Sequence, residues 1–364
     1  MFLEQLKLTD FKNYHEAEFE FCEKVNAVVG ENGSGKTNLL DAIHYLSLTK
    51  SYFTPQDHFS VRFGSDFFAI HGKFVAFKDQ TSIPISCTFK ENGRKLMKTN
   101  NKECKLMADH IGLFPLIMIS PYDNDIINNG SEVRRKFFDM IISQYDKNYL
   151  RNLMVYQKII AQRNVVLKQM IEQRYYDAGL IKIYDEQLIE PGNEIFNKRK
   201  QYLEEIIPFF QNYYDILSES KEQVSVIYES GLLSRSFEEG LKENEPSDRK
   251  SGYTNFGVHK DDYLFLINGR SIKRFGSQGQ QKCYSIALKL AQYDYIYTQK
   301  NIKPILLLDD IFDKLDAKRI EQLLGLMGKE HIGQVFISDN NELRIKEILN
   351  IHGITYKLLS ITTT

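Results

Sequence analysis

Residues Gly30 to Thr37 read GENGSGKT, and this stretch decides the fold class of the chain. It fits G-x-x-x-x-G-K-[ST], a glycine-rich turn whose backbone N–H groups surround phosphate oxygens. The apolar run Val25 to Val29 before it predicts a buried strand, and Thr37 to Leu48 after it has apolar residues at helical spacing. A phosphate would therefore lie at a helix N-terminus, where unpaired N–H groups and the helix dipole favour anions. The pattern predicts a nucleoside triphosphate site.

A second run, ILLLDD at Ile305 to Asp310, lies near the other end of the chain. We expect its Asp309 to bind Mg²⁺ together with the Thr37 hydroxyl. Lys36 is expected to contact the β- and γ-phosphates, and Asp310 to orient the attacking water, which makes these two the catalytic candidates. The alternative is that the acidic pair only caps the element that follows the strand.

A third motif lies between these two, where Ser277 to Lys282 read SQGQQK at the start of a predicted helix. A serine followed by glycine at a helix start offers a hydroxyl, free N–H groups and close approach of a ligand to the backbone. The alternative is a serine that caps its own helix and has no further role.

Composition narrows the classes of protein without deciding between them. The chain has 364 residues, is 42% hydrophobic and carries a formal net charge of −1. Nucleic-acid binding would therefore depend on local basic patches instead of an overall positive field. No apolar run is long enough for a transmembrane helix, the N-terminus lacks the pattern of a secretion signal, and the four cysteines form no C-x-x-C motif. These features favour a cytoplasmic protein without a membrane partner.

The spacing of apolar residues, and with it the predicted secondary structure, changes along the chain. Short strand-like runs dominate up to about residue 119, and Glu91 to Arg94 reads as a hairpin turn. From Ser131 to about Tyr214 the spacing is helical, with one apolar face of a long helix predicted at Leu153, Tyr156, Ile160, Leu167 and Ile171. Pro191-Gly192 is predicted to break this helical region, Pro208 to end or kink its second helix, and Glu243 to Gly252, with Pro246, to form a loop or hinge.

Three segments follow from this organisation. Residues 1–125 are expected to form the N-terminal part of an ATPase lobe with the phosphate loop. Residues 126–250 are expected to form an inserted helical lobe, and residues 251–364 the C-terminal part of the ATPase lobe. The motifs at the two ends must meet in one lobe.

The motifs together resemble those of the ABC-type ATPases of chromosome maintenance. GENGSGKTNLLDAI resembles their phosphate loop, SQGQQK their signature motif, and LLLDDIFDKLD their Walker B strand and D-loop. Further runs resemble the bacterial RecF family in particular, and they follow the family's order along nearly the whole chain. These runs are FKNY at 11–14, SPYD at 120–123, GSEVRRKFFD at 130–139 and GVHKDD at 257–262.

The resemblance implies an α/β fold: an ABC-type ATPase head, a P-loop lobe with a mixed sheet, carrying a mainly helical second lobe between the Walker A and signature motifs. It implies ATP and Mg²⁺ as cofactors and an ATP-dependent homodimer, in which the signature serine of one copy closes over the γ-phosphate held by the other. Hydrolysis would be weak and would reset the pair. The residues implied to contact the nucleotide are Gly30, Glu31, Asn32, Gly33, Ser34, Gly35, Lys36, Thr37, Asn38, Lys12, Ser277, Gly279 and Gln280.

The sequence departs from the family pattern at several positions. Lysine replaces the common arginine at Lys12 and Lys260, which keeps the charge but loses the forked donor geometry. The other replacements are Val258 for proline, and Tyr122 and Lys314 for acidic residues. No histidine follows the strand that ends at 337–339, which leaves Ser338 or Asp339 as the candidate γ-phosphate sensor. Gln56 is the available glutamine for sensing Mg²⁺.

The resemblance also implies partners. These are single- and double-stranded DNA bound without sequence specificity, RecR- and RecO-type mediators, and a RecA-type recombinase, in recombinational repair and replication-fork maintenance. The basic candidates for phosphate contacts lie in Lys90 to Lys105 and in Arg151 to Lys182, and either segment is alternatively a solvated surface. For Arg134 and Arg135 the sequence leaves three roles undecided: DNA contact, ion pair at an interface, or surface charge.

Four other functions are alternatives to this one. They are the ATPase subunit of a membrane transporter, a protein-partner-gated ABC ATPase without a direct DNA role, a chromosome organiser of the cohesin–condensin type, and a small-molecule kinase. The SQGQQK motif differs from the L-S-G-G-Q of transporters, and the helical insertion is far too short for the coiled coil of an organiser. A kinase would keep its two nucleotide motifs closer together.

Overall fold

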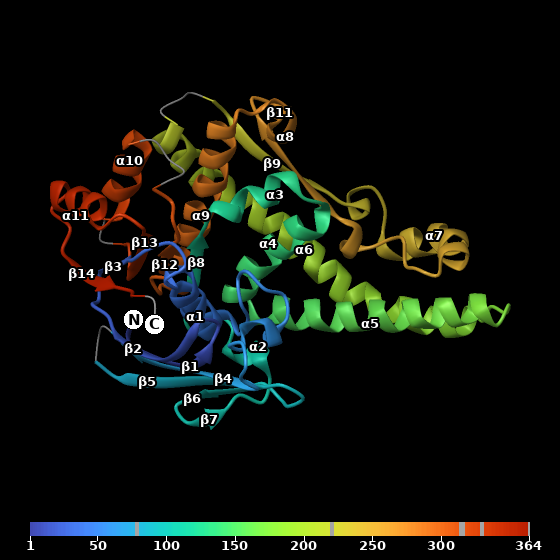
Figure 1. The fold of residues 1–364 in the computed structure, drawn as a ribbon. Helices are drawn as coiled ribbons and strands as arrows, with labels where there is room; N and C mark the ends of the chain where they lie inside the picture. Colours follow the sequence, from blue (N-terminus) through green and yellow to red (C-terminus); the bar gives the residue numbers. More distant parts are fainter. Residues whose placement is uncertain (77–79, 219–221, 313–316, 328–330, 363–364) are drawn as a thin grey trace. The chain divides into compact units, whose positions relative to one another are not determined.

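A computed structural model describes residues 1–76, 80–218, 222–312, 317–327 and 331–362 (Figure 1). The chain divides into two compact units. The first comprises Met1–Asp123, Tyr213–Ser220 and Lys282–Thr364, and the second comprises Asn124–Asn212 and Lys221–Gln281. Both ends of the chain therefore contribute to one unit, as the two nucleotide motifs require.

The first unit contains a six-stranded antiparallel sheet and a five-stranded parallel sheet. The mixed character predicted for this lobe is thus divided between two sheets. In spatial order the antiparallel strands are β2 (Tyr14–Glu20), β1 (Phe2–Phe11), β4 (Phe67–Val75), β5 (Ser82–Lys90), β6 (Leu96–Thr99) and β7 (Lys102–Glu103). The parallel strands are β14 (Tyr356–Ser360), β3 (Val25–Val29), β13 (Val335–Asp339), β12 (Ile305–Leu308) and β8 (Leu116–Ile119).

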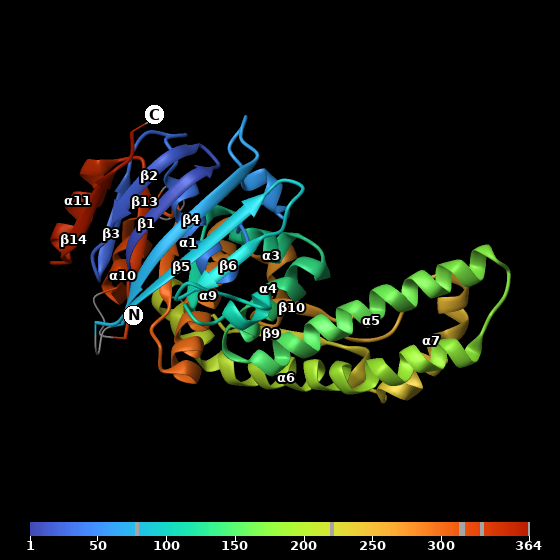
Figure 2. The same cartoon turned by 90° about the horizontal axis from the view of Figure 1, so that it is seen from below.

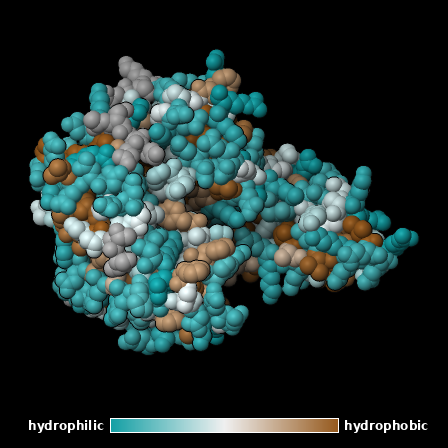
Figure 3. Space-filling model, in the orientation of Figure 1, coloured by the Kyte–Doolittle hydropathy of each residue, from teal (hydrophilic) through white to brown (hydrophobic). Residues whose placement is uncertain are grey.

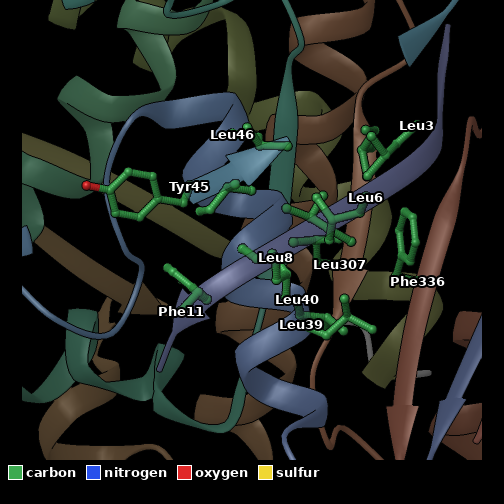
Figure 4. Close-up of a cluster of buried hydrophobic side chains, with 14 of the residues drawn as sticks. Leu3, Leu6, Leu8, Phe11, Leu39, Leu40, Tyr45, Leu46, Leu307 and Phe336 are labelled. Carbon is green, nitrogen blue, oxygen red and sulfur yellow. The ribbon is translucent and has the colours of Figure 1, made fainter. Parts of the chain in front are cut away.

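Helix α1 (Lys36–Leu48) lies between these two sheets and contacts strands of both. Figure 4 shows the resulting core, where leucines of β1 meet Leu39, Leu40 and Leu46 of α1, with Leu307 and Phe336 from the parallel sheet. Nearly all residues of α1 are buried, and its position between two sheets removes its apolar side chains from water on both sides. The phosphate loop is therefore anchored at the start of the most deeply buried helix of this unit.

The remaining helices of the first unit are short or lie outside its sheets. Figure 1 shows α10 and α11 on the side of the parallel sheet away from α1. These elements are η1 (Asp57–Ser60), α2 (Met107–His110), η2 (Pro121–Asn124), α10 (Ala317–Met327) and α11 (Glu342–Ile351). Two helices are shared by both units: α6 (Ala178–Ser218) and α9 (Gln278–Lys300).

The second unit combines long helices with a three-stranded sheet of order β11-β10-β9 (Figure 2). Its helices are α3 (Asp125–Asn128), α4 (Ser131–Tyr145), α5 (Lys147–Glu172), α7 (Phe237–Ser251) and α8 (Ile272–Phe275), with the short η3 (Gly231–Leu233) and η4 (Val258–Lys260). Its strands are β9 (Val224–Glu229), β10 (Asp262–Ile267) and β11 (Arg270–Ser271).

The predicted break at Pro191-Gly192 is wrong, because α6 continues through both Pro191 and Pro208. A buried stripe that includes Leu188, Ile195 and Tyr202 runs along the helix. Burial of this stripe outweighs the cost of about 3 kcal/mol that an interior proline imposes. Gly192 serves packing instead, since a Cβ there would lie 2.2 Å from the ring of Phe237.

The loop predicted for Glu243 to Gly252 is also wrong, because these residues belong to α7 and its C-cap. The helix begins with a capping box, in which Ser236 and Glu239 each bond the other's backbone N–H. It ends at Gly252, whose φ of 72° suits glycine. The S-x-x-E pattern at Ser236 was the sequence feature that could have revealed this helix, and Pro246 concealed it.

The predicted apolar face of α5 is only partly buried. Tyr156 and Leu167 are buried, but Ile171 is exposed, and the buried stripe includes Arg163. Figure 3 shows hydrophobic side chains on the surface over the end of α5, where Val165 and Ile171 are exposed. Within the described residues, no helix combines the length and the apolar character needed to cross a membrane.

The second boundary between the units differs from the one predicted. Residues 251–281 were assigned to the ATPase lobe, but they fall in the second unit. Strand pairing explains this, because β10 bonds β9 along its whole length and so ties this segment to the chain after α6. The signature motif consequently begins in a different unit from the phosphate loop.

Candidate functional site: a nucleotide site at the edge of the parallel sheet

The phosphate loop connects β3 to α1, as its sequence predicts. Gly35 has a φ of 114°, and a Cβ there would lie 2.6 Å from Asn13 Nδ2, so only glycine fits. At Gly30 a Cβ would lie 2.4 Å from the carbonyl oxygen of Ile361. Glu31, Asn32 and Gly33 are exposed at the outer rim of the loop. The loop backbone is thus closely packed against Asn13 and Ile361, whereas its residues Glu31 to Gly33 are open to solvent.

Lys36 folds back across this loop. Its Nζ donates to the carbonyl oxygens of Gly30 and Glu31, both at 2.9 Å. The Ser34 hydroxyl is buried and has no hydrogen-bond partner within the described part of the chain. A cation and a buried hydroxyl at a helix N-terminus fit a phosphate group, which accepts hydrogen bonds from both.

Asp309 brings the second motif to the loop. Its Oδ1 accepts hydrogen bonds from the Thr37 hydroxyl at 3.0 Å and from the Ser338 hydroxyl at 2.8 Å. Ser338 in turn accepts the backbone N–H of Asp310 at 2.9 Å. Thr37 lies in the first turn of α1, whereas Asp309 and Ser338 lie at the ends of neighbouring parallel strands, so one edge of the sheet gathers all three. Hydroxyl and carboxylate oxygens are the donors that Mg²⁺ prefers.

The Asp309 carboxyl is only 2% exposed, and its burial raises the pKa to about 6. The negative charge of Asp310 contributes to this rise. The hydrogen bonds from Ser338 and Thr37 and the charge of Lys36 act in the opposite direction. A buried carboxylate that lacks a full counter-charge is the environment that a divalent cation would relieve.

The turn between β1 and β2 packs directly on the phosphate loop. Asn13 Nδ2 donates to the Ser34 carbonyl oxygen at 3.2 Å, and Asn38 Nδ2 donates to Asn13 Oδ1 at 2.7 Å. The Tyr14 hydroxyl donates to the Gly35 carbonyl oxygen at 3.0 Å. The motif FKNY thus supplies two residues, Asn13 and Tyr14, that hydrogen-bond the loop, a role that the sequence alone did not assign to them.

Lys12, in the same turn, was predicted to contact the nucleotide. In the structure its Nζ lies 2.6 Å from Asp41 Oδ2, and it lies 5.3 Å from the centroid of the Phe53 ring. Asp41 belongs to α1 and is fully buried. The nucleotide contact of Lys12 remains a prediction, and Asp41 is a partner that the sequence did not reveal.

Ser277 lies directly before α9, in the second unit. Its hydroxyl accepts the Gln280 N–H at 3.2 Å, and Gln280 Oε1 accepts the Ser277 N–H at 2.7 Å. Gln280 Nε2 also donates to Glu222 at 2.6 Å. The serine therefore caps its helix, as the simpler interpretation expected. A cap is compatible with a ligand role, because both present the same helix N-terminus.

Comparison with known proteins agrees with this geometry. The family model described as RecF/RecN/SMC N terminal domain matches residues 2–362. A protein of Flavobacterium johnsoniae named DNA replication and repair protein RecF is 45% identical, over 99% of this chain and 100% of its own length. A protein of the same name from Bacteroides fragilis is 43% identical, over 99% of this chain and 96% of its own. The chain belongs to the RecF family.

Solved structures place the fold in the same family. A structure of the recombination mediator protein RecF with ATP, in the RecFOR pathway, aligns with a TM-score of 0.87 at 31% identity, covering 93% of this chain and 92% of that one. An Smc head domain bound to a winged-helix domain of ScpA aligns with a TM-score of 0.55 at 16% identity, covering 95% of this chain and 91% of that one, which shows a shared fold alone. The predicted ABC-type ATPase head with a helical lobe is confirmed.

Several positions of the RecF family motifs have structural partners in this chain. Arg134 forms a forked pair with Asp262, and Arg135 donates to the Asp261 carbonyl oxygen at 2.6 Å. His259 is partly buried, its Nε2–H donates to the Thr254 carbonyl oxygen, and its Nδ1 accepts the Tyr156 hydroxyl. Burial lowers the pKa of His259 to about 4. These motif residues hold the second unit together.

The two candidates for a γ-phosphate sensor differ in their contacts. Ser338 belongs to the hydrogen-bond network of Asp309 described above. Asp339 is bonded by both Nε and an Nη of Arg344, at 3.0 and 2.6 Å. Ser338 is therefore the candidate that contacts Asp309, and its role as a sensor stays a prediction. Gln56 is exposed at the start of η1, and Lys314 lies outside the described residues.

Several basic residues of the two segments Lys90 to Lys105 and Arg151 to Lys182 are paired or buried, so fewer of them are free to contact DNA phosphates than the sequence suggests. In the first segment Arg94 pairs with Glu103, and Lys95 pairs with Asp57 at 2.8 Å. In the second segment Arg163 is fully buried between Asp185 and Asp248. The exposed basic residues of the first segment without an ion pair among the described residues are Lys98, Lys102 and Lys105.

Proposed function

We propose that this protein is an ATP-dependent DNA-binding protein of recombinational repair that hydrolyses ATP weakly and uses hydrolysis as a switch. The observation that carries the proposal is the Asp309 carboxylate, which bonds the Thr37 hydroxyl of the phosphate loop and the Ser338 hydroxyl of the neighbouring strand. The names of the relatives, DNA replication and repair protein RecF, support the repair role.

The residues fit ATP and Mg²⁺. The loop N–H groups, the buried Ser34 hydroxyl and Lys36 would hold phosphate oxygens, and Thr37 with Asp309 would hold the metal ion. Bound Mg²⁺ would supply positive charge against the phosphates and against the buried Asp309 carboxylate. Asp310 follows Asp309 on the same edge and would orient the water that attacks the γ-phosphate.

The site also requires a second copy of the chain. Ser277 caps the N-terminus of α9, and the resemblance of SQGQQK to the signature motif of the family supports the assignment of this serine to the nucleotide of a partner copy. ATP would then drive homodimerisation, and the dimer would act as a clamp on DNA. RecR- and RecO-type mediators and a RecA-type recombinase are the protein partners proposed for it, and the cytoplasm is the proposed location.

Three exposed lysines, Lys98, Lys102 and Lys105, at and beyond the β6–β7 edge of the antiparallel sheet are the proposed DNA contacts in the first unit. A dimer would double their number, and phosphate contacts of this kind weaken steeply with salt. Because backbone contacts carry no sequence information, such a clamp needs no base code.

The test is steady-state ATP turnover by the full chain, with and without linear double-stranded DNA, at 50 and 200 mM salt, roughly the range over which phosphate contacts weaken strongly. DNA stimulation that fades with salt supports the clamp. The Lys36→Met variant is the control for contaminating ATPase. Turnover that ignores DNA at both salt concentrations would instead support an ATPase gated by a protein partner.

A further inference from the structure

Within the first unit, a series of hydrogen-bonded polar groups, buried or partly buried, leads from the phosphate loop to α9. It begins at Lys12, in the turn that packs on the loop, and its first step is the ion pair with Asp41. The same Asp41 Oδ2 accepts the Ser51 hydroxyl at 2.7 Å, and Oδ1 accepts the backbone N–H of Tyr52 at 2.7 Å. One fully buried carboxylate thus holds both Lys12 and the segment that follows α1.

The next step passes through the Tyr52 side chain to α9. The Tyr52 hydroxyl donates to Asp123 Oδ1 and accepts a hydrogen bond from Lys289 Nζ at 3.1 Å. Lys289 is 2% exposed, lies 3.3 Å from Asp123 Oδ1, and donates to the Met118 carbonyl oxygen at 2.9 Å. Asp123 also accepts the Ser120 N–H at 2.8 Å, which explains the aspartate of the SPYD motif.

The charges in this hydrogen-bonded series make the position of each member depend on the partners of Lys12 and Lys289. Lys12 with Asp41 and Lys289 with Asp123 form two buried opposite-charge pairs, joined by the backbone and the hydroxyl of one tyrosine. A buried charge that loses its partner is strongly disfavoured, so its neighbours rearrange to compensate. If Lys12 turned towards a phosphate, Asp41 would lose its counter-charge while Tyr52 stayed bonded to it.

We propose that Asp41 and Tyr52 are positioning residues that transmit the nucleotide state from Lys12 to Lys289 on α9. The proposal rests on the proposed function in one respect, since it requires ATP at the phosphate loop. It goes beyond that function by naming the route within one chain. Because α9 begins at Gln278, next to Ser277, the route ends on the helix that presents the signature serine.

Tyr52→Phe is the sharpest variant, because it removes the hydroxyl and leaves both ion pairs and the Tyr52 N–H bond in place. We expect the affinity for ATP to change less than about twofold. In the wild type, ATP should change the opening equilibrium constants that hydrogen exchange measures for α9 residues 282–300. In Tyr52→Phe this factor of change should be about tenfold smaller, which is within the range usual for coupling between sites.

Tyr213→Phe is the matched control. Its hydroxyl also donates to an aspartate of α9, Asp294, at 2.6 Å. Its side chain is buried, whereas that of Tyr52 is partly buried, and among the described residues its hydroxyl makes no hydrogen bond to Lys12, Asp41, Asp123 or Lys289. The control should bind ATP and show the wild-type change in exchange. Equal losses in both variants would overturn the proposal, because they would reflect general loosening of α9.

A double-variant comparison separates transmission from packing. Lys12→Met should already lose the response of α9, so adding Tyr52→Phe should have little further effect. Additive losses, or a wild-type response in Tyr52→Phe, would overturn the route. A wild-type chain that binds no ATP would overturn the proposed function as well, whereas ATP binding without any change along α9 would overturn the route alone.

Discussion

Replacement of Asp309 by asparagine is expected to stabilise the nucleotide-free protein at neutral pH while abolishing Mg²⁺-dependent turnover. Asparagine keeps a carbonyl oxygen that can accept the hydrogen bonds from Thr37 and Ser338, but it carries no charge. The wild-type carboxyl is buried, and its pKa rises from 3.8 to about 6 on folding. At neutral pH the ionised Asp309 carboxylate therefore destabilises the folded state, and a bound cation would offset this cost.

The sign and the magnitude follow from this rise in pKa. Between pH 4 and 6 the folded state holds a proton that the unfolded state has released, so the wild type loses stability as the pH rises through this window. The full loss above pH 6 is about 3 kcal/mol, at about 1.4 kcal/mol for each pH unit. Near pH 5 roughly half of it is present, so the gain in the variant should grow by about 1.5 kcal/mol between pH 5 and pH 7.5.

Differential scanning calorimetry in EDTA, without nucleotide, measures this gain as the difference in Tm between variant and wild type at each pH. For a unit of this size the difference should grow by roughly 3–6 °C from pH 5.0 to 7.5. Asp339→Asn is the control, because Asp339 is equally buried but paired with Arg344, so its loss should lower Tm at both pH values. A difference that does not change with pH, or a less stable Asp309→Asn variant at pH 7.5, would refute the reasoning.

The other predictions concern the loop and the dimer. Lys36→Met should weaken ATP binding more than about tenfold in equilibrium titration, because one charge-assisted contact to phosphate is lost; wild-type affinity would contradict its role. Ser277→Arg should bind ATP yet stay monomeric in sedimentation, whereas Ser277→Asn, which keeps the helix cap, should fold equally well. A normal ATP-dependent dimer of Ser277→Arg would exclude action across the interface. Asp310→Asn should accumulate an ATP-bound dimer with turnover at least about 100-fold lower, since a positioned base contributes roughly 10²–10⁴-fold; rapid turnover would rule it out as the base. Gly30→Ala should lower the Tm by several degrees in thermal unfolding, because its Cβ would lie 2.4 Å from the carbonyl oxygen of Ile361; an unchanged Tm would show that the backbone at Ile361 shifts to make room.

Much of the nucleotide site was predictable because its parts are local patterns. The strand Val25–Val29, the strand Ile305–Leu308 and the helix that follows the loop all occur where apolar runs and glycines indicate them. The meeting of Thr37 with Asp309 was predictable for a different reason. Parallel strands end at one edge, and the chemistry of a nucleotide site needs both motifs there.

The partners of charged side chains were not predictable, because they come from distant parts of the chain. Arg163 looked like a surface charge on a helix, yet it is buried by two aspartates that lie 22 and 85 residues further along. Lys12 looked like a nucleotide contact, and Asp41 holds it in the structure. Helical periodicity shows which residues share a face, but it does not say what covers that face.

The sequence by itself determined the class of the fold and predicted the chemistry of the site, since the phosphate loop, the acidic residues after a strand and the signature motif are each encoded within a few consecutive residues. Tertiary structure alone decided the rest. It kept α6 helical through Pro191 and Pro208, made a helix around Pro246, and moved residues 251–281 into the second unit. The physical reason is the same in each case: burial of side chains and strand pairing between distant segments outweigh the local preference of one or two residues for a turn.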